Sequence, residues 1–478
     1  MAAFNGWKRE PDASAPTLWA EFGRRLRGWR RRAGLTQAQV ARQVGYDHTV
    51  ISKLESGRRE PPSRLVRRLD ELLQTGGELL AACTETPGQY LPPEVAASRS
   101  DGIRLTPLPG DGQNHRTDLP IVSITNWPRS LPSHGLDCPL HGTLGCSVPA
   151  VGDALLTYQA MSGADPTAQL SPHADPDTIH VLTALLAVYN RAGVEQVSVG
   201  LTAAVEHALH GMTRWLEVLT GRPRRAVLRL AASYAELAGE LRLQQGQNGL
   251  AMAWFTMGLR WAVETDDIGM RVALLCDMST LARLEHDAAS TLGYARALRS
   301  VDADRTWVAM LADIYEARGH ALTGDAAQVR HHIDSARKLS EHLGPRDDAE
   351  APWLFGSAGQ VYVETGASAA LRDIAARTAD RATARLAVAA VERSLDRLPE
   401  FMHPARVLFT LRLADGYACA GEPQAALTVA EPVLTAAVTQ PTAIISQELR
   451  GLQSRLAAGW GDQPDVRAFL RNLNAGPA

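Results

Sequence analysis

The stretch LTQAQVARQVGYDHTVISKLESGRREP, residues 35–61, decides the fold of the first part of this chain. Thr36 stands three residues before Gln39, which is the capping-box pattern that opens a helix. We therefore expect a helix over residues 37–44, which Gly45 ends because glycine readily adopts the left-handed conformation at a helix C-terminus.

A second helix is expected directly after the first. Asp47 can accept hydrogen bonds from the free N–H groups at the start of a helix over residues 48–55, and Gly57 ends that helix. Two short helices joined by a tight turn predict a helix-turn-helix. Apolar side chains at helical spacing predict two flanking helices, over residues 18–32 and 63–73.

Charge is unevenly divided along the chain. The net charge is only −3 over 478 residues, but residues 17–82 carry 13 Lys and Arg against seven Asp and Glu. The part after residue 82 is acidic, with 34 basic against 43 acidic side chains. A basic head on an acidic body predicts a polyanionic partner for the head, and nucleic acid is the leading candidate.

Residues 18–75 resemble the lambda-repressor type of helix-turn-helix, also called the xenobiotic response element (XRE) family. The motifs that carry the resemblance are LTQAQVA at 35–41, Gly45, and VISKLESGRREP at 50–61. The resemblance implies that the second helix of the pair enters the major groove of double-stranded DNA.

The resemblance also assigns roles to individual side chains. It implies base contacts from His48, Thr49, Ser52 and Lys53, a phosphate contact from Gln37, and backbone contacts from Arg58 and Arg59. It further implies an ion pair between Arg30 and Glu55 that orients the recognition helix. The alternative for the whole head is a solvated charged face or a protein-docking module.

Residues 83–150 lack helical periodicity and are rich in Pro, Gly, Ser and Asp, which predicts a long irregular linker with one strand-like run at 119–124. Four side chains of zinc-ligand type cluster there with the spacing H-x3-C-x2-H-x4-C: His134, Cys138, His141 and Cys146. Such side chains on a loop can surround a tetrahedral zinc ion. Because the order differs from that of a zinc knuckle, a loop without metal is the alternative.

Helical patterning returns after the linker as a loose repeat. Its best copies are residues 241–262, 319–339 and 416–434, in which a helix, a glycine with small or polar neighbours, and an alanine-rich helix follow one another. Weaker copies surround His286 and Gly366, and most intervals are about 40 residues. This period predicts a solenoid of paired helices of the tetratricopeptide (TPR) type.

No catalytic motif accompanies the repeat. The chain has no phosphate-binding glycine loop, no Gly-x-Ser-x-Gly and no His-Glu-x-x-His, so we expect that it is not an enzyme. Six aromatic residues are expected to pack between repeat helices, with the lining of a ligand groove as the alternative: Trp254, Phe255, Trp261, Trp307, Tyr315 and Trp353.

Composition predicts a cytoplasmic, all-α protein. Hydrophobic residues make up 45% of the chain and aromatic residues only 5%. No run of 18 apolar residues could span a membrane, and residues 1–10 lack the apolar core of a signal peptide. Five widely spread cysteines favour a reducing compartment over a disulfide framework.

We predict a chain of four parts: an arm at 1–17, a helix-turn-helix domain at 18–82, a linker at 83–150, and a helical repeat domain at 151–478. This order resembles the large actinobacterial regulators of the XRE family and the peptide-pheromone receptors of Gram-positive bacteria. Those receptors hold a peptide with asparagines, whereas between residues 178 and 460 this chain has only Asn190 and Asn248. A small molecule, a peptide and a protein therefore all remain candidate effectors.

The expected function is that of a sequence-specific transcription regulator with an effector-sensing body. We expect a homodimer on a palindromic operator, because one helix-turn-helix reads only a half-site. Apolar faces of terminal helices need covering and are expected to serve the dimer: Ile444, Ile445, Leu449 and Leu452. The alternative is an interaction scaffold that the head tethers to DNA. Zinc in the linker is a candidate cofactor, the dipeptide Cys138-Pro139 is a much weaker signal of haem, and no membrane partner is expected.

Overall fold

In a computed structural model, the chain forms two compact units, Met1–Ile103 and Arg104–Ala478, and each is described by itself. The structure describes residues 20–44, 46–57, 61, 63–75, 79, 127–133, 136–142, 144–152, 176–195, 199–354, 356–399, 402–439 and 442–475. The predicted arm 1–17 and the strand-like run 119–124 lie outside these ranges.

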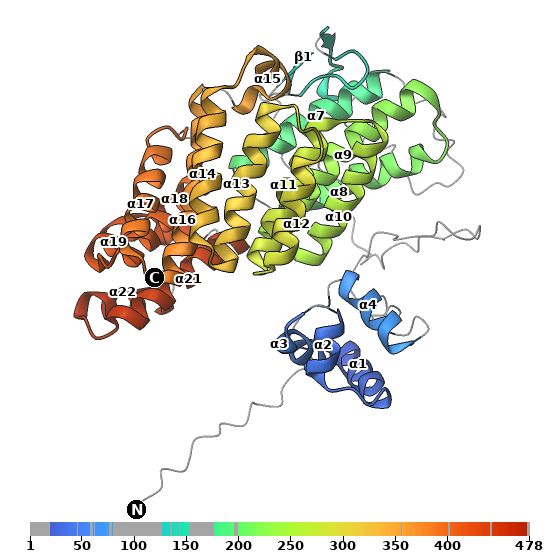
Figure 1. Cartoon of the computed structure of the whole chain (residues 1–478). Helices are drawn as coiled ribbons and strands as arrows, with labels where there is room; N and C mark the ends of the chain where they lie inside the picture. Colours follow the sequence, from blue (N-terminus) through green and yellow to red (C-terminus); the bar gives the residue numbers. More distant parts are fainter. Residues whose placement is uncertain are drawn as a thin grey trace, which may run out of the picture. The chain divides into compact units, whose positions relative to one another are not determined.

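The first unit is a small helical domain. Its helices are α1 (Ala20–Arg32), α2 (Gln37–Val44), α3 (His48–Glu55) and α4 (Ser63–Leu73) (Figure 1). The capping box is present, since the Gln39 N–H donates to Thr36 Oγ1 at 3.2 Å and the Thr36 N–H donates to Gln39 Oε1 at 2.8 Å. Asp47 accepts from the Thr49 N–H at 2.8 Å. The bounds of α2 and α3 are therefore those that the caps predict.

One apolar core holds the helices of this unit together. The helix-turn-helix pair contributes Val40, Ala41, Val44, Ile51 and Leu54, and the flanking helices contribute Phe22, Leu26, Leu65, Val66, Leu69 and Leu73. All of these side chains are buried. The predicted apolar seam between α2 and α3 is thereby confirmed.

The second unit is a solenoid of paired helices, as predicted (Figure 1). Its pairs are α7 (Pro176–Glu195) with α8 (Val199–Leu216), α9 (Gly221–Gln244) with α10 (Asn248–Glu264), α11 (Ile268–Leu284) with α12 (Ala288–Arg299), α13 (Thr306–Thr323) with α14 (Ala326–Glu341), α16 (Gly356–Thr378) with α17 (Arg381–Leu395), and α18 (His403–Ala420) with α19 (Pro423–Ala430). Short helices α15 (Pro345–Glu350) and η2 (Pro352–Leu354) precede α16. The chain continues through η3 (Glu431–Val433), α20 (Leu434–Thr439), α21 (Ala443–Trp460) and α22 (Pro464–Ala475).

The turns inside the helix pairs coincide with four of the predicted repeat positions. Gly246, Gly324 and Gly421 have φ angles of 75°, 84° and 84°, and His286 has a φ of 58°. This left-handed conformation ends one helix and directs the chain back along it.

The repeat position predicted at Gly366 is wrong. Gly366 lies inside α16, and the turn that follows this helix is at Ala379, with a φ of 55°. A Cβ atom on Gly366 would lie 2.3 Å from Ile314 Cγ2 of α13. Gly366 is therefore needed for the close approach of α13 and α16. The interval between the turns at Gly324 and Ala379 is longer than the others because α15 and η2 are inserted between them.

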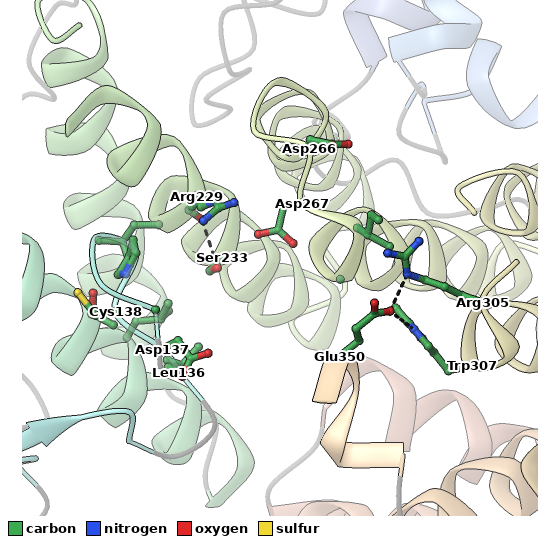
Figure 2. Close-up of a pocket in the computed structure, with 17 residues that line it drawn as sticks. Leu136, Asp137, Cys138, Arg229, Ser233, Asp266, Asp267, Arg305, Trp307 and Glu350 are labelled. Atoms are coloured by element: carbon green, nitrogen blue, oxygen red, sulfur yellow. Dashed lines mark hydrogen bonds and ion pairs between the residues drawn. The ribbon is translucent and has the colours of Figure 1, made fainter. Parts of the chain in front are cut away.

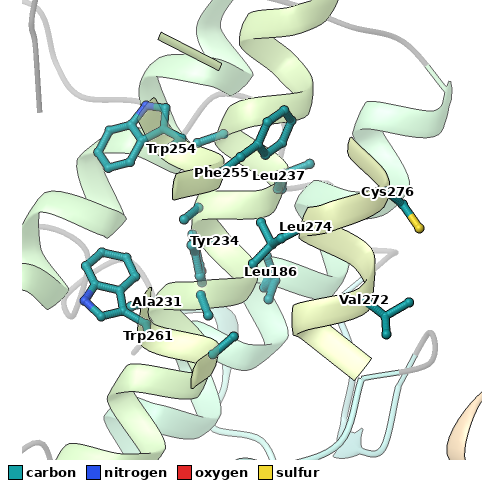
Figure 3. Packing of buried hydrophobic residues seen from close by; sticks show 14 of the residues in the cluster. Leu186, Ala231, Tyr234, Leu237, Trp254, Phe255, Trp261, Val272, Leu274 and Cys276 are labelled. Atoms are coloured by element: carbon teal, nitrogen blue, oxygen red, sulfur yellow. The ribbon is translucent and has the colours of Figure 1, made fainter. Parts of the chain in front are cut away.

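Aromatic and aliphatic side chains fill the space between the solenoid helices (Figure 3). Packing is confirmed for five of the six aromatic residues singled out: Trp254, Phe255, Trp261, Trp307 and Tyr315. It is wrong for Trp353, which lies in η2 and is 47% exposed. Trp353 lies on a short helix between two helix pairs, and its ring contacts that of Tyr362, with ring centres 5.3 Å apart.

Part of the predicted linker belongs to the second unit. Strands β1 (Ser130–Leu131) and β2 (Cys146–Ser147) pair in antiparallel fashion, with Leu131 opposite Cys146. Leu131 is buried, and three side chains of this segment pack against the solenoid core: Trp127, Leu136 and Leu140. Residues 127–152 are thus attached to the body through apolar contacts.

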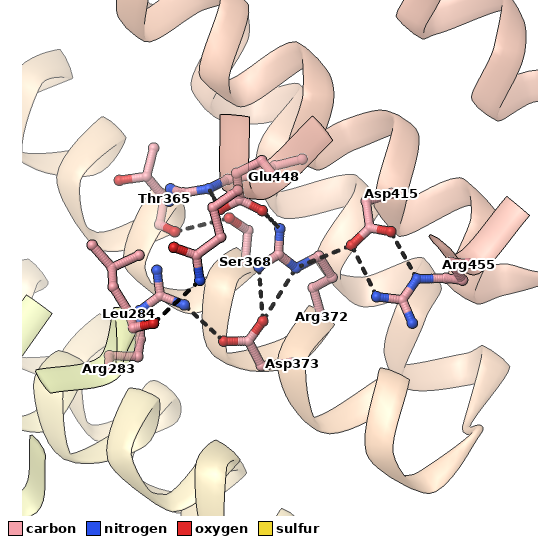
Figure 4. A network of polar contacts seen from close by, with 11 residues as sticks. Arg283, Leu284, Thr365, Ser368, Arg372, Asp373, Asp415, Glu448 and Arg455 are labelled. Atoms are coloured by element: carbon pink, nitrogen blue, oxygen red, sulfur yellow. Dashed lines mark hydrogen bonds and ion pairs between the residues drawn. The ribbon is translucent and has the colours of Figure 1, made fainter. Parts of the chain in front are cut away.

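An ion-pair network joins α16, α18 and α21 (Figure 4). The buried Arg372 guanidinium binds Glu448, lies 2.8 Å from Asp373 Oδ1, and lies 3.5 Å from Asp415 Oδ2. Three more arginines pair with these carboxylates: Arg283, Arg412 and Arg455. Burial alone would raise the pKa of Glu448, but the charges of the surrounding arginines hold that pKa well below its usual range.

The apolar side chains predicted to serve a dimer are covered within the chain itself. Ile445 and Leu452 are buried, and Ile444 and Leu449 pack against the neighbouring clusters. Helix α21 lies against α18 and α22, which sequence periodicity does not reveal.

In the part of the chain that the structure describes, no helix is both long enough and apolar enough to cross a lipid bilayer.

The ion-pair network predicts a large difference between two arginine substitutions. Arg372→Ala should lower the free energy of unfolding by about 3–5 kcal/mol, because it leaves buried carboxylates without their partner. Arg385→Ala removes an exposed pair with Glu422, at 3.1 Å, and should cost less than about 1 kcal/mol. Chemical denaturation of the full chain measures both, and equal losses would contradict the role given to burial.

The lowered pKa of Glu448 also predicts how stability changes with pH. Ionised Glu448 adds to the free energy of unfolding. This stabilisation is complete above the pKa of an unfolded glutamate, about 4.3, and is lost as the pH falls toward the lower pKa of Glu448 in the folded state. Denaturation of the wild type between neutral and acidic pH should show this loss. Arg372→Ala should reduce the loss of unfolding free energy on acidification. An unchanged pH dependence in this variant would contradict the assignment of that loss to Glu448.

Candidate DNA-binding surface

The C-terminal end of α3 is fixed to α1 through the buried carboxylate of Glu55. Arg30 donates from Nε to Oε1 and from Nη2 to Oε2, the latter at 3.0 Å. Gln37 of α2 donates to Oε2 at 2.8 Å, and Arg27 Nε lies 3.4 Å from the same atom. The structure thus contains the Arg30–Glu55 pair and adds a contact from the other helix of the motif.

These partners keep Glu55 ionised in a buried position. Burial would raise the pKa of this carboxyl, but hydrogen bonds from Arg30 and Gln37 and the charges of Arg30 and Arg27 hold the pKa below its usual value. A Cβ atom on Gly23 would lie 2.5 Å from Leu54 O, so glycine at this position lets α1 reach the end of α3. Sequence reasoning missed Gly23, although a glycine in an otherwise regular helix is a signal of close packing.

The side chains assigned to base contacts form one exposed stripe on α3. His48, Thr49, Ser52 and Lys53 are all exposed, while Ile51 and Leu54 of the same helix are buried. The stripe begins at the N-terminus of α3, the part of a recognition helix that faces base edges. Its donors and acceptors are therefore available to a major groove.

The structure says less about the residues assigned to phosphate contacts than about those assigned to base contacts. The Gln37 amide donates to Glu55, as described above, so its phosphate contact stays a prediction. Arg58 and Arg59 lie outside the described residues. Further positive charge comes from exposed arginines in the last turns of α1 and α2: Arg31, Arg32 and Arg42.

A second group of polar side chains gathers in the body. Cys138, His141 and Cys146 come together as the sequence predicted, and His180 of α7 joins them. One donor atom from each of the four residues lies within 4.8 Å of the others. Burial and the neighbouring Cys138 thiol raise the pKa of Cys146 to about 11. The predicted fourth member, His134, lies outside the described residues.

Sequence reasoning missed His180 because it is 39 residues beyond His141 and belongs to a different element. The signal in the sequence was weak. His180 interrupts the apolar face that α7 buries, at 6% exposure, and a lone histidine in that setting is more often part of a core. Only the folded chain brings it to the loop.

A cavity of about 460 Å³ lies between the loop that contains Cys138 and the solenoid helices (Figure 2). Its polar lining comes from both sides: Asp137, Arg229, Ser233, Asp266, Asp267, Arg305 and Glu350. Arg305 and Trp307 both donate to Glu350, which holds one end of the cavity in place. The volume is in the range of pockets that hold small molecules.

Comparison with known proteins identifies the head. Residues 21–83 match the family described as a helix-turn-helix domain, and this range lies within the first unit and contains α2, α3 and α4 and nearly all of α1. No curated protein and no solved structure matches the chain. The match and the helix arrangement together give this protein a helix-turn-helix DNA-binding domain at its N-terminal end.

Proposed function

We propose that this protein is a sequence-specific transcription regulator rather than an enzyme. In this proposal, α3 reads an operator in the major groove, and the helical body senses an effector and joins two chains. The observation that carries the proposal is the exposed stripe of His48, Thr49, Ser52 and Lys53 on a helix whose orientation Glu55 fixes. A rigid polar stripe of this kind can discriminate between base pairs.

The proposal of a homodimer rests on the size of the head. A single helix-turn-helix contacts one half-site, and symmetric dimers bind two half-sites about one helical turn apart. Because the apolar side chains of α21 pack against other helices of the same chain, we place the contact between chains on another surface of the body. We propose that the chain reads a palindromic operator in this way.

The proposal of an effector rests on the cavity of the body. Charged groups of both signs line its wall, and Arg229 Nε is buried without a hydrogen-bond partner among the described residues. A polar ligand that carries hydrogen-bonding groups, including an acceptor for Arg229 Nε, would fit this chemistry. The second candidate function is a scaffold that recruits a protein to DNA, for which the solenoid offers the surface.

DNA binding provides the first test. The purified full chain should enrich a defined sequence from a library of random duplexes. Thr49→Ala and Lys53→Ala should each weaken binding to that sequence by on the order of 1–3 kcal/mol and relax discrimination, because each removes a base contact. Arg58→Ala should weaken binding to operator and scrambled duplexes alike.

Glu71→Gln is the matched control, because Glu71 is exposed on α4 outside the motif, and it should change neither affinity. Enrichment of no sequence would contradict the proposed function. Equal losses on operator and scrambled duplexes for Thr49→Ala and Lys53→Ala would contradict the base contacts alone.

Oligomeric state provides the second test. Light scattering on the full chain at micromolar concentration should give twice the mass of one chain, and the enriched operator should be palindromic. A monomer that binds a single asymmetric site would overturn the dimer.

The effector is tested through thermal unfolding. A dialysable fraction of cell extract should stabilise the wild type, by about 2.7 kcal/mol when the ligand is at 100 times its Kd. Ser233→Phe, which narrows the cavity, should abolish the effect while DNA binding persists. Retention of a partner protein from undialysed extract, with no response to small molecules, would favour the scaffold.

A further inference from the structure

The group formed by Cys138, His141, Cys146 and His180 has the donor chemistry of a zinc site. Two thiolate sulfurs and two imidazole nitrogens are a common ligand set for structural zinc, whereas Mg²⁺ and Ca²⁺ prefer oxygen. Cys138 and His180 are both buried, which excludes bulk water from one side of the group. Among the described residues, His180 supplies the fourth donor, and His134, which the sequence suggested, lies outside them.

Two donor–donor distances in the group match the spacing of ligands around zinc, and all four donor atoms lie within 4.8 Å of one another. Zinc bonds of about 2.0–2.3 Å at tetrahedral angles place donor atoms roughly 3.3–3.8 Å apart. Cys138 Sγ lies 3.4 Å from His141 Nδ1, and His180 Nε2 lies 3.4 Å from the same nitrogen. His141 would therefore bind through Nδ1 and His180 through Nε2.

The backbone holds three of the four ligands in place. The Gly142 N–H donates to Cys138 O at 2.7 Å and closes the turn that carries Cys138 and His141. Cys146 belongs to β2 and lies opposite Leu131 of β1. The ligand positions follow from hydrogen bonding of the loop and do not depend on flexible side chains alone.

Partners around His180 also suit a metal ligand. Asp177, one turn earlier on α7, places Oδ1 3.9 Å from His180 Nδ1, the ring nitrogen that does not face the group. A carboxylate that accepts a hydrogen bond from the far nitrogen of a histidine ligand orients the ring, and 3.9 Å is too long for a direct bond of that kind, so Asp177 contributes only a nearby negative charge.

A second group of similar residue types has a different explanation. Asp313, Glu316 and His332 also lie together in the body. Arg299 already supplies their positive charge, with Nη2 2.6 Å from Asp313 and Nε 3.1 Å from Glu316. That group is therefore an ion-pair cluster.

We propose that Cys138, His141, Cys146 and His180 bind one zinc ion that fastens the 136–147 loop to α7. The regular structure of this loop is limited to β2, a strand of two residues that pairs with β1, so a metal would add cohesion beyond the apolar contacts of Leu136 and Leu140. The same loop forms one wall of the cavity in Figure 2, through Leu136, Asp137 and Cys138. Zinc thereby sets the shape of that wall.

The ligand assignment is tested by metal analysis of the full chain prepared without chelators. The wild type should contain one zinc per chain, and His180→Ala and the double variant Cys138→Ser, Cys146→Ser should contain almost none. His134→Ala and Cys419→Ser are the matched controls and should keep the zinc. Loss of zinc in His134→Ala with retention in His180→Ala would overturn the assignment of His180, and substoichiometric zinc in the wild type would overturn the site.

A second measurement avoids variants that fail to fold. Zn²⁺ added to chelator-treated wild type should bind at one site per chain and protect the loop from limited proteolysis, while Mg²⁺ should do neither. Co²⁺ in place of Zn²⁺ should give the charge-transfer absorption of cobalt–thiolate bonds. Zinc that binds without loop protection, or cobalt without thiolate absorption, would contradict the proposed role. DNA binding is not used as the readout, so failure here leaves the proposed function standing.

Discussion

Buried carboxylates that arginines neutralise constrain the helices in both units. Glu55 of the head and Glu448 of the body are almost inaccessible to solvent, and each is bonded to arginines from other helices. Removing a charge from water costs several kcal/mol, and only a well-placed partner offsets that cost. The helices that carry the partners must therefore keep one arrangement. In the head, this arrangement aims the exposed stripe of α3; in the body, it fixes the last helix pairs against one another.

The proposed regulator combines this rigidity with a cavity that has a loop as one wall. A ligand changes DNA binding only if it binds one arrangement of the protein better than another. The solenoid side of the cavity consists of packed helices, whereas the opposite side is a loop with little core of its own. A metal that orders this loop would lower the conformational entropy that an effector has to overcome on binding. Effector sensing and metal binding would then meet in one part of the body.

Much of the fold could be predicted because its signals are local. The caps at Thr36 and Asp47 lie within three residues of the groups that they satisfy, so they mark the start of α2 and α3 correctly. Glycine at 246, 324 and 421 marks turns for the same reason. The prediction failed at Gly366, where a neighbouring helix and not the local backbone demands a glycine. It failed in the same way for the face of α21, which other helices cover.

The two helical architectures, the basic head and the exposed residues of α3 could be predicted from the sequence, because these features depend on periodicity, capping and charge along a continuous stretch. Which distant groups meet depends on how the helices pack. His180 joins a loop 39 residues away, and Arg372 meets a carboxylate 76 residues away. Helical periodicity says which face of a helix is buried, but it does not say which other helix lies against that face. Contacts between distant elements depend on the packing of the whole body, and for that reason the position of His180 beside the loop and the ion pairs of Arg372 emerged only from the folded chain.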